Sequence, residues 1–556
     1  MRISEGKPPL TIRQRVFHGW LRLQREWRVA RINRQVEKHT KPGIGDKPVA
    51  FFNASTRLGG FSQNAAFSLL TAWSLQLANI PVVHFVCKSG MRRCVLGTNI
   101  DNPSMAPPCE VCIAQSKRLL KSGEMVWFDF QFDPELGSVL ESLSVEELSD
   151  YHFMVDDPQL SIHGQILPVG PLVLPALRWA LRRHHLFDDS TTRFLLQSYI
   201  QSAYSIVKKF DQFLDQTDPM AIVVFNGTMY PEAVARWVAK KRNLRVITQE
   251  VGFQPFSAFF TEGQATAYPM QIPEDFELSE VQNTRLDEYL NQRFKGQFTM
   301  AGIRFWPQMS GLEHDFLEKA NLFKQIVPVF TNVINDTSQV HASTVFTDMY
   351  DWLEHVVEVI RAYPETLFVI RAHPDEKRLG TRKHSRQPVS DWVVQNNVDQ
   401  LPNVIFVDSN EPLSSYELIQ KSKFIIVYNS SIGLEAALMG VPVLCGGKAR
   451  YTQYPTVFFP QTPSEYQKLT AQFLGQREID LPEVFIRNAK RVLYWQLYRV
   501  SLPFSPYLES HPTPGYVQLK KFAWQDLLED HSTTIKVLTK GILLGGPFIL
   551  PEEEYP

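Results

Sequence analysis

The sequence lacks long apolar runs and has almost no net charge. No hydrophobic stretch approaches the roughly 20 residues that a membrane-spanning helix requires. The N-terminal segment MRISEGKPPLTIRQRV has no apolar core of the kind that a signal peptide carries. Lys and Arg number 57 against 58 Asp and Glu, a balance that argues against a basic nucleic-acid binder. We therefore expect a cytoplasmic protein with no nucleic-acid partner.

Cysteine is scarce, yet four of the five cysteines lie close together in the sequence, as Cys87-x6-Cys94-x14-Cys109-x2-Cys112. Disulfides are rare in the cytoplasm, and four thiolates suit a tetrahedral zinc ion with no open position for catalysis. A structural zinc, free thiols and disulfides remain three interpretations of this cluster. Cys445 follows an apolar strand and is expected in the core.

At 556 residues the chain is too long for a single core and suits two large domains with extensions. Short apolar strands alternate with helical patterns in two separate regions, which predicts an α/β fold with two Rossmann-like, doubly wound domains facing an interdomain cleft. The predicted parts are an N-terminal helix over residues 1–47, domains over 48–320 and 321–475, and a helical extension over 476–556.

The segment up to Lys47 is strongly basic, with 12 Lys and Arg against 4 Asp and Glu, a difference of 12 − 4 = +8. A helix is predicted over residues 11–38, with apolar residues at three- and four-residue spacing, tryptophans included. Such a helix can lie on an anionic membrane surface, or it can pack on the body of the protein with its basic face in water. Both interpretations stay open.

The most informative segment is Tyr428–Val443, in which an apolar strand ends in small polar residues and a helix begins. A helix start offers free backbone N–H groups and partial positive charge, the arrangement that binds phosphate. Ser430 and Ser431 would add hydroxyl donors, Gly433 would permit close approach, and Glu435 could accept hydrogen bonds from ribose. The alternative is that Ser431 merely caps the helix. The predicted nucleotide-sugar-binding residues of this segment are Asn429, Ser430, Ser431, Ile432, Gly433 and Glu435.

Two neighbouring strand ends add candidates to the same edge. His373 follows a predicted strand, where open α/β sheets place their ligands, and a histidine there can donate to phosphate or act as an acid toward the leaving nucleotide. Arg371 could add positive charge, and Asn332 follows the first strand of the second domain and could touch phosphate or sugar. The alternative is that His373 is structural.

The first domain offers a candidate base. Glu250 ends a predicted strand, and a carboxylate there could remove a proton from an acceptor hydroxyl, or serve only as a cap or ion-pair partner. The turn containing Arg57, Gly59 and Gly60 follows the first strand and is predicted to lie near the acceptor. The sequence has no DxD doublet for a bound divalent ion, so we expect no cofactor in catalysis.

Tyr428–Val443 together with Gly446–Tyr451 resembles the capsule polysaccharide biosynthesis family, over roughly residues 325–460. That resemblance implies a GT-B glycosyltransferase, in a family that includes transferases of Kdo from CMP-Kdo. The chain is similar also to CMP-sugar GT-B enzymes, including bacterial sialyltransferases, in which an HP histidine and a serine pair hold the nucleotide phosphate. These roles would fall on His373, Ser430 and Ser431.

The CMP-sugar enzymes also carry an acidic residue ahead of a glycine as the base, which Glu250-Val251-Gly252 matches only in part, because Val251 interrupts the acidic pair. The resemblance implies a CMP- or UDP-linked donor and a polysaccharide or glycolipid acceptor. A sugar-nucleotide 2-epimerase and a non-catalytic scaffold of a polysaccharide assembly machine are the alternatives.

Overall fold

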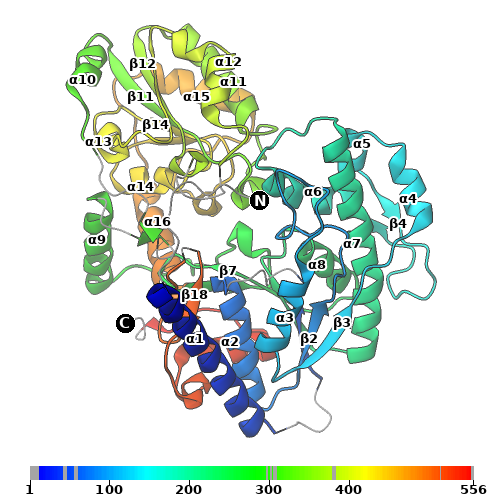
Figure 1. Ribbon diagram of the computed structural model, residues 1–556. Helices are drawn as coiled ribbons and strands as arrows, with labels where there is room; N and C mark the ends of the chain where they lie inside the picture. The colour runs from blue at the N-terminus through cyan, green and yellow to red at the C-terminus, as the bar shows by residue number, and fades with distance from the viewer. Residues whose placement is uncertain are drawn as a thin grey trace.

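The computed structural model describes residues 12–41, 47–54, 61–295, 299–300, 303–304, 310–377, 384–513 and 515–552. Arg57, Gly59 and Gly60, predicted to line the acceptor side, therefore lie outside the described residues. Two α/β domains are stacked one above the other, and helix α16 (Glu483–Tyr494) runs between them (Figure 1).

The first domain is built on a seven-stranded sheet in the order β16-β8-β7-β6-β1-β2-β3. The central strands pair in parallel, whereas β8 and β16 are antiparallel at one edge. The strands are β1 (Val49–Asn53), β2 (Val82–Cys87), β3 (Glu124–Phe128), β6 (Ala221–Phe225), β7 (Val246–Val251), β8 (Ser257–Thr261) and β16 (Leu502–Pro503).

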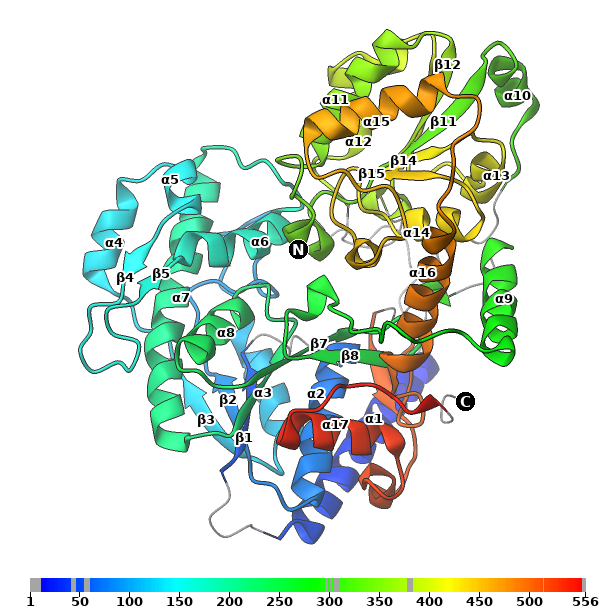
Figure 2. The same cartoon turned by 180° about the vertical axis from the view of Figure 1, so that it is seen from behind.

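Helices cover both faces of this sheet, which explains why β1 is apolar at nearly every position. Phe51 packs toward one face and Phe52 toward the other, and both are buried. The helices on the Phe51 face are α1 (Ile12–His39), α2 (Gln63–Leu77) and α17 (Thr533–Leu544), which lie side by side (Figure 2). Those on the Phe52 face are α6 (Val169–Leu181), α7 (Ser190–Thr217) and α8 (Glu232–Lys241).

The second domain has a five-stranded parallel sheet in the order β13-β12-β11-β14-β15. The strands are β11 (Gln325–Phe330), β12 (Thr366–Arg371), β13 (Val404–Val407), β14 (Ile425–Val427) and β15 (Val443–Cys445). One face packs on α11 (Met349–Ala362), α12 (Val389–Gln395) and α15 (Pro463–Gly475), and the other on α14 (Ile432–Leu438) and α16. Both domains are thus doubly wound, and the predicted α/β class with two Rossmann-like domains is confirmed.

Shorter elements connect these layers. The remaining helices are α3 (Cys109–Leu119), α4 (Pro134–Glu141), α5 (Val145–Ser149), α9 (Glu280–Phe294), α10 (His314–Ala320) and α13 (Ser415–Gln420). The remaining strands form small antiparallel pairs and are β4 (Phe153–Met154), β5 (Ile166–Leu167), β9 (Thr299–Met300), β10 (Ile303–Arg304), β17 (Leu508–Ser510) and β18 (Val517–Leu519).

The C-terminal tail returns to the first domain rather than extending the second. After α16, strand β16 pairs with β8, and the buried residues Ile535, Leu538 and Ile542 of α17 join the core of the first domain. The tail that the sequence predicts as helical therefore also supplies an edge strand. Its apolar helix face explains this position, because an amphipathic helix is stable only where that face is covered.

Helix α1 is held to the first domain by only part of its length. Val29, Ile32 and Val36 are buried in the core on the α2 face, whereas Trp20, Leu23 and Trp27, nearer the start of the helix, are exposed. Arg28 adds an ion pair at 2.7 Å to Glu509. Among the described residues, no helix combines the length and apolar character needed to cross a membrane.

Candidate functional site

The strand order of the second domain places its topological switch point between β11 and β14, the position at which open α/β sheets bind ligands. Asn332 follows β11 and Asn429 follows β14, and the structure brings the two together. The Asn332 Nδ2 donates to Asn429 Oδ1 at 2.7 Å, and the Gln339 Nε2 donates to the same oxygen at 3.1 Å. This amide network fixes the start of the Ser430–Ser431 turn.

The turn itself differs from the simple helix-start cradle that the sequence predicts. Helix α14 has only 7 residues, so its dipole is small. Ser431 is exposed and makes no side-chain capping bond, whereas Ser430 is buried and its carbonyl accepts a 2.8 Å hydrogen bond from the Tyr451 hydroxyl. A Cβ on Gly433 would collide with the same hydroxyl, so packing of Tyr451 alone requires glycine here. Ile432 is half-buried.

Glu435 has a different partner from the ribose that the sequence suggests. Its carboxylate forms a buried ion pair with Arg293 of α9 at 2.6 Å and accepts a hydrogen bond from the Tyr416 hydroxyl. Because both carboxylate oxygens are engaged inside the domain, the geometry assigns Glu435 a structural role. Sequence spacing could not reveal this pair, because Arg293 lies 142 positions away.

Arg371 likewise serves the fold. Its guanidinium donates to the carbonyls of Asp408 at 3.3 Å and Glu411 at 2.8 Å, and burial lowers its pKa to about 10. His373 lies just beyond it, at the carboxyl end of β12. The His373 Nδ1 accepts the backbone N–H of Asp375 at 3.1 Å, so the neutral ring carries its proton on Nε2.

Glu250, the predicted base, lies at the end of β7, where the second domain faces the first. Its Oε1 accepts hydrogen bonds from the Val251 backbone at 2.9 Å and from Asn64 Nδ2 at 3.1 Å. Burial raises the pKa of Glu250, and the nearby positive charge of Arg450 partly offsets that rise. A carboxyl with a raised pKa beside a cation has the properties of a general base.

Arg450 belongs to the second domain but reaches the first. Its guanidinium lies over the ring of Tyr268, 4.9 Å from the centroid, and 5.6 Å from the ring centroid of Phe253. Both rings belong to the first domain and follow β7. The structure therefore brings a carboxylate from one domain and a guanidinium from the other to a single place.

Sequence reasoning missed a group of residues that meet at this boundary. The His341 Nε2 lies 2.9 Å from the Thr266 hydroxyl, which joins the two domains. Burial, followed by the charges of Lys448, Arg450 and Arg236, lowers the pKa of His341 to about 4. The imidazole is therefore neutral near pH 7, and three cations surround it. Two of these cations, Lys448 and Arg450, lie in the segment Gly446–Tyr451, and its basic residues could have indicated this group from the sequence.

Buried polar atoms without a hydrogen-bond partner gather at the same boundary. Burial lowers the pKa values of Arg178 and Arg182 of the first domain, and Asp348 and Asp336 of the second domain partly offset this, the first acting on Arg178 and the second on Arg182. These two arginines therefore lie near the domain boundary. Buried polar atoms of folded proteins nearly always have a hydrogen-bond partner, so these atoms are positioned to bind a ligand or water. Within the described part of the chain, those at the boundary are the Nε atoms of Arg178, Arg182 and Arg236 and the Oδ1 atoms of Asn64 and Asn335.

A histidine–aspartate contact fixes one end of the domain boundary. The His185 Nε2 lies 3.0 Å from Asp348 Oδ2, and the His184 Nε2 lies 3.5 Å from it. The Gln387 side chain accepts both histidine backbone N–H groups, at 3.0 and 3.1 Å. The pKa of Asp348 falls to about 2 and burial lowers that of His184 to about 4, so the carboxylate is charged and His184 is neutral near pH 7.

The four clustered cysteines lie at the carboxyl edge of the first sheet and line one pocket. All have free thiols, which leaves the disulfide interpretation without support in the structure.

Comparison with known proteins agrees with the sequence resemblance. Residues 308–455 match the family described as "Capsule polysaccharide biosynthesis protein". Protein FixF of Sinorhizobium fredii (strain NBRC 101917 / NGR234) is 25% identical over 306 residues, which is 50% of this chain. The match spans 61% of that relative's own length, less than two thirds of it. The resemblance to the capsule polysaccharide biosynthesis family is thus confirmed over the second domain.

Solved structures show more distant likenesses. The β-Kdo 2,4-transferase KpsC of Thermosulfurimonas dismutans has a TM-score of 0.33 at 12% identity, covering 54% of this chain and 84% of its own. The UDP-GlcNAc 2-epimerase of Neisseria meningitidis has a TM-score of 0.24 at 12% identity, covering 81% of this chain and 99% of its own.

The buried ion pair of Arg293 with Glu435 is expected to stabilise the fold. We expect Arg293→Met to lower the free energy of unfolding by about 3–5 kcal/mol, because it leaves a buried carboxylate without its partner. Arg293→Met combined with Glu435→Gln should recover most of that loss, since no charge then remains buried. Chemical denaturation monitored by circular dichroism measures both. Equal stability of the parent and the single variant would contradict the structural role.

Proposed function

We propose that the chain is a glycosyltransferase that moves a sugar from a nucleotide-sugar donor to a saccharide acceptor of a surface polysaccharide, capsule or glycolipid. The observation that carries this proposal is the meeting of Glu250 of the first domain with Arg450 of the second, beside His341. A base and a cationic group on opposite sides of a domain boundary suit transfer between two substrates. The capsule biosynthesis match over residues 308–455 supports the class of product.

The second domain would hold the donor. Asn332, Asn429, Ser430 and Ser431 lie at the switch point of its sheet, and His373 follows β12, the strand next to β11, at the same edge. The nucleotide would bind there, with its phosphate toward the cations that lie at the boundary. The cationic residues proposed to face the phosphate are Arg236, Lys448 and Arg450.

Glu250 would act as the base. It would take the proton of the acceptor hydroxyl, whose oxygen then forms a bond to the anomeric carbon of the donor. The bond from that carbon to the phosphate oxygen breaks, and its electron pair leaves with the nucleotide. Arg450 and Lys448 would stabilise the departing negative charge, so that the chain itself supplies the positive field and the transfer is independent of metal.

Replacement of the base gives the most direct test. We expect Glu250→Gln to lower kcat for transfer by roughly 10²–10⁴-fold while nucleotide binding is retained, because the amide cannot accept the proton. In the parent, kcat should rise with pH through a pKa above the ordinary value of a glutamate, since only the ionised form is a base and burial raises its pKa.

Glu262→Gln serves as the matched control, because Glu262 is a largely exposed carboxylate paired with Arg245. Assays combine nucleotide sugars with saccharide acceptors and follow nucleotide release and product mass. Unchanged kcat in Glu250→Gln would refute its role as the base. Conversion of the donor alone, with no acceptor product, would instead indicate a 2-epimerase.

Nucleotide binding tests the donor side independently. In a thermal-shift screen of CMP, UDP, GDP and dTDP, we expect one nucleotide to stabilise the parent by about 2.7 kcal/mol at a hundredfold excess over Kd. Arg450→Met and His373→Ala should lose most of this shift. Arg193→Gln, at an exposed surface pair with Asp188, should keep it. The absence of any nucleotide effect in the parent would favour a scaffold, and equal shifts in all variants would place the site elsewhere.

The membrane surface is proposed as a further partner, through the first half of α1. Trp20, Leu23 and Trp27 follow helical spacing and expose 55%, 66% and 56% of their surface, in a segment rich in arginine. Tryptophan and leucine can enter the lipid interface while basic residues contact anionic headgroups. This arrangement would place the acceptor side of the first domain near a lipid-linked saccharide.

Vesicle sedimentation tests this proposal. We expect the parent to bind vesicles containing anionic phospholipid, weakly in high salt, and Leu23→Ser with Trp27→Ser to reduce binding by about tenfold or more, because apolar burial is lost. Leu322→Ser is the control, since Leu322 is an even more exposed apolar side chain, in the second domain. Identical binding of all three proteins would contradict the proposed contact.

A further inference from the structure

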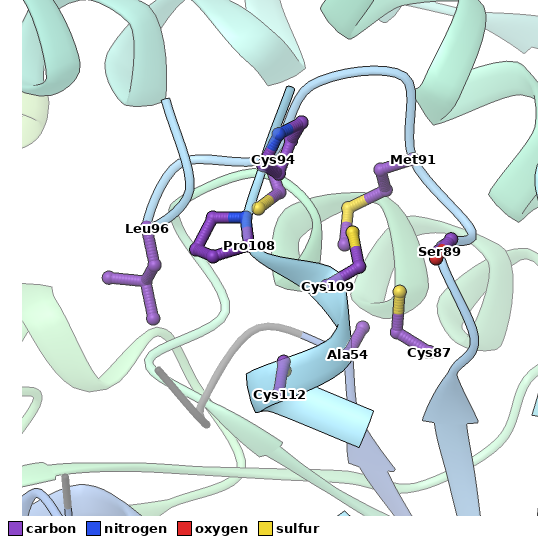
Figure 3. A pocket seen from close by; sticks show the side chains of 10 residues that line it. Ala54, Cys87, Ser89, Met91, Cys94, Leu96, Pro108, Cys109 and Cys112 are labelled. Atoms are coloured by element: carbon purple, nitrogen blue, oxygen red, sulfur yellow. The ribbon is translucent and has the colours of Figure 1, made fainter. Parts of the chain in front are cut away.

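The cysteines that the proposed transfer reaction does not use come together from three segments. Cys87 ends β2, Cys94 lies in the following loop, and Cys109 and Cys112 lie in the first turns of α3. Figure 3 shows their side chains around one pocket, with Ala54 and other apolar residues completing its wall. Four sulfurs from separate segments in one pocket are the donor set of a structural zinc site.

Two of the sulfurs lie in turns of the same kind. The Gly90 backbone N–H donates to Cys87 Sγ at 3.1 Å, and the Gly97 backbone N–H donates to Cys94 Sγ at 3.2 Å. In both cases the donor is three residues beyond the cysteine, so the loop contains two C-x-x-G turns. Hydrogen bonds of this kind favour the thiolate, the form that binds a metal.

The Gly97 turn also leaves no room for a side chain. A Cβ at Gly97 would lie 2.8 Å from Cys94 Sγ and 2.7 Å from the Cβ of Pro107. The loop is thus packed closely around the sulfur, which is unusual for a surface connection and suits a loop that is ordered by a bound ion.

The other two sulfurs share one face of α3. Cys109 and Cys112 are three residues apart, which places their side chains on the same side of the helix. Their position at the start of an 11-residue helix places the partial positive charge of the helix end near both sulfurs. The negative charge of a tetrathiolate site would therefore be offset at both pairs: at Cys87 and Cys94 by backbone N–H groups, and at Cys109 and Cys112 by the start of α3.

A reactive thiol is a poorer explanation. Burial raises the pKa of Cys87 and of Cys94 to about 12, and the other thiols of the cluster add to the rise. Nucleophilic or redox cysteines need a lowered pKa. A metal ion, in contrast, displaces thiol protons when it binds, so the protonated state of the metal-free pocket is no obstacle.

The sulfurs are not yet at metal-bound spacing. Among the described residues, His184, His185 and Asp348 are the only group with three metal-binding atoms within 4.8 Å of one another. Around zinc, with Zn–S bonds of about 2.3 Å, thiolates stand roughly 3.8 Å apart. Neutral thiols do not attract one another, so the cysteine side chains must rotate inward as the ion binds.

We propose that Cys87, Cys94, Cys109 and Cys112 bind one structural zinc ion. The ion ties the loop of residues 88–108 to the end of β2 and the start of α3. Several hydrogen bonds hold this loop to the first domain. The Tyr230 hydroxyl donates to the Arg93 carbonyl at 2.9 Å, the Arg92 N–H donates to Ser202 Oγ at 2.9 Å, and the Thr98 and Tyr199 hydroxyls lie 3.0 Å apart. The zinc thereby fixes part of the carboxyl edge of the first sheet. This inference does not depend on glycosyl transfer.

Metal analysis of the full-length protein, purified without chelators, tests the proposal. We expect about one zinc ion per chain, as measured by inductively coupled plasma mass spectrometry. Cys109→Ser with Cys112→Ser should lose it, and Cys445→Ser, which removes the buried thiol of the second domain, should retain it. The parent loaded with Co²⁺ should show the visible absorption of tetrahedral thiolate coordination.

Cys112→His is a second variant that tests the site even if the double variant does not fold. It keeps four ligands, so it should hold zinc with a shifted Co²⁺ spectrum. Removal of zinc from the parent by a chelator should lower its unfolding temperature, and re-addition should restore it. A parent without stoichiometric zinc and without a Co²⁺ spectrum overturns the proposal. So does iron with acid-labile sulfide in place of zinc, or a disulfide within the cluster.

Discussion

The nearness of opposite charges across the domain boundary is the constraint on which the proposed site depends. Glu250 and Arg450 come from different domains, and each is held by local contacts: Glu250 by Asn64 and its own strand end, Arg450 by the rings of Tyr268 and Phe253. A buried carboxylate is costly without a nearby cation. The second domain, through Arg450, thus favours the charged form of the carboxylate that the first domain contributes.

The rest of the boundary combines polar contacts with an apolar cluster, in which Phe259 and Tyr268 pack together with residues of the second domain. Hydrogen bonds join Thr266 to His341 and His185 to Asp348, and the Gln387 side chain accepts two backbone N–H groups of the first domain. The surrounding arginines have polar atoms without protein partners, which is the state expected of a site that a charged ligand completes.

Sequence patterns located the ends of the ligand-binding strands well, but not the partners of the side chains found there. Asn332 and Asn429 were predicted from strand ends and do meet at the switch point. Glu435 was expected to bind ribose, yet Arg293 from a helix before the second domain neutralises it. Arg178, Arg182 and His341 carried no periodic or motif signal. Their function comes from long-range packing, which places segments more than 100 residues apart at one boundary.

By itself the sequence determined the two doubly wound domains, because continuous apolar strands alternating with helical patterns can be buried only in parallel sheets covered on both faces. It also determined which residues follow those strands. Only the tertiary structure decided that the C-terminal tail completes the first domain, that Arg450 faces Glu250, and that four cysteines from three segments share one pocket. Those outcomes depend on how whole elements pack, and packing between distant segments leaves no local pattern in the chain.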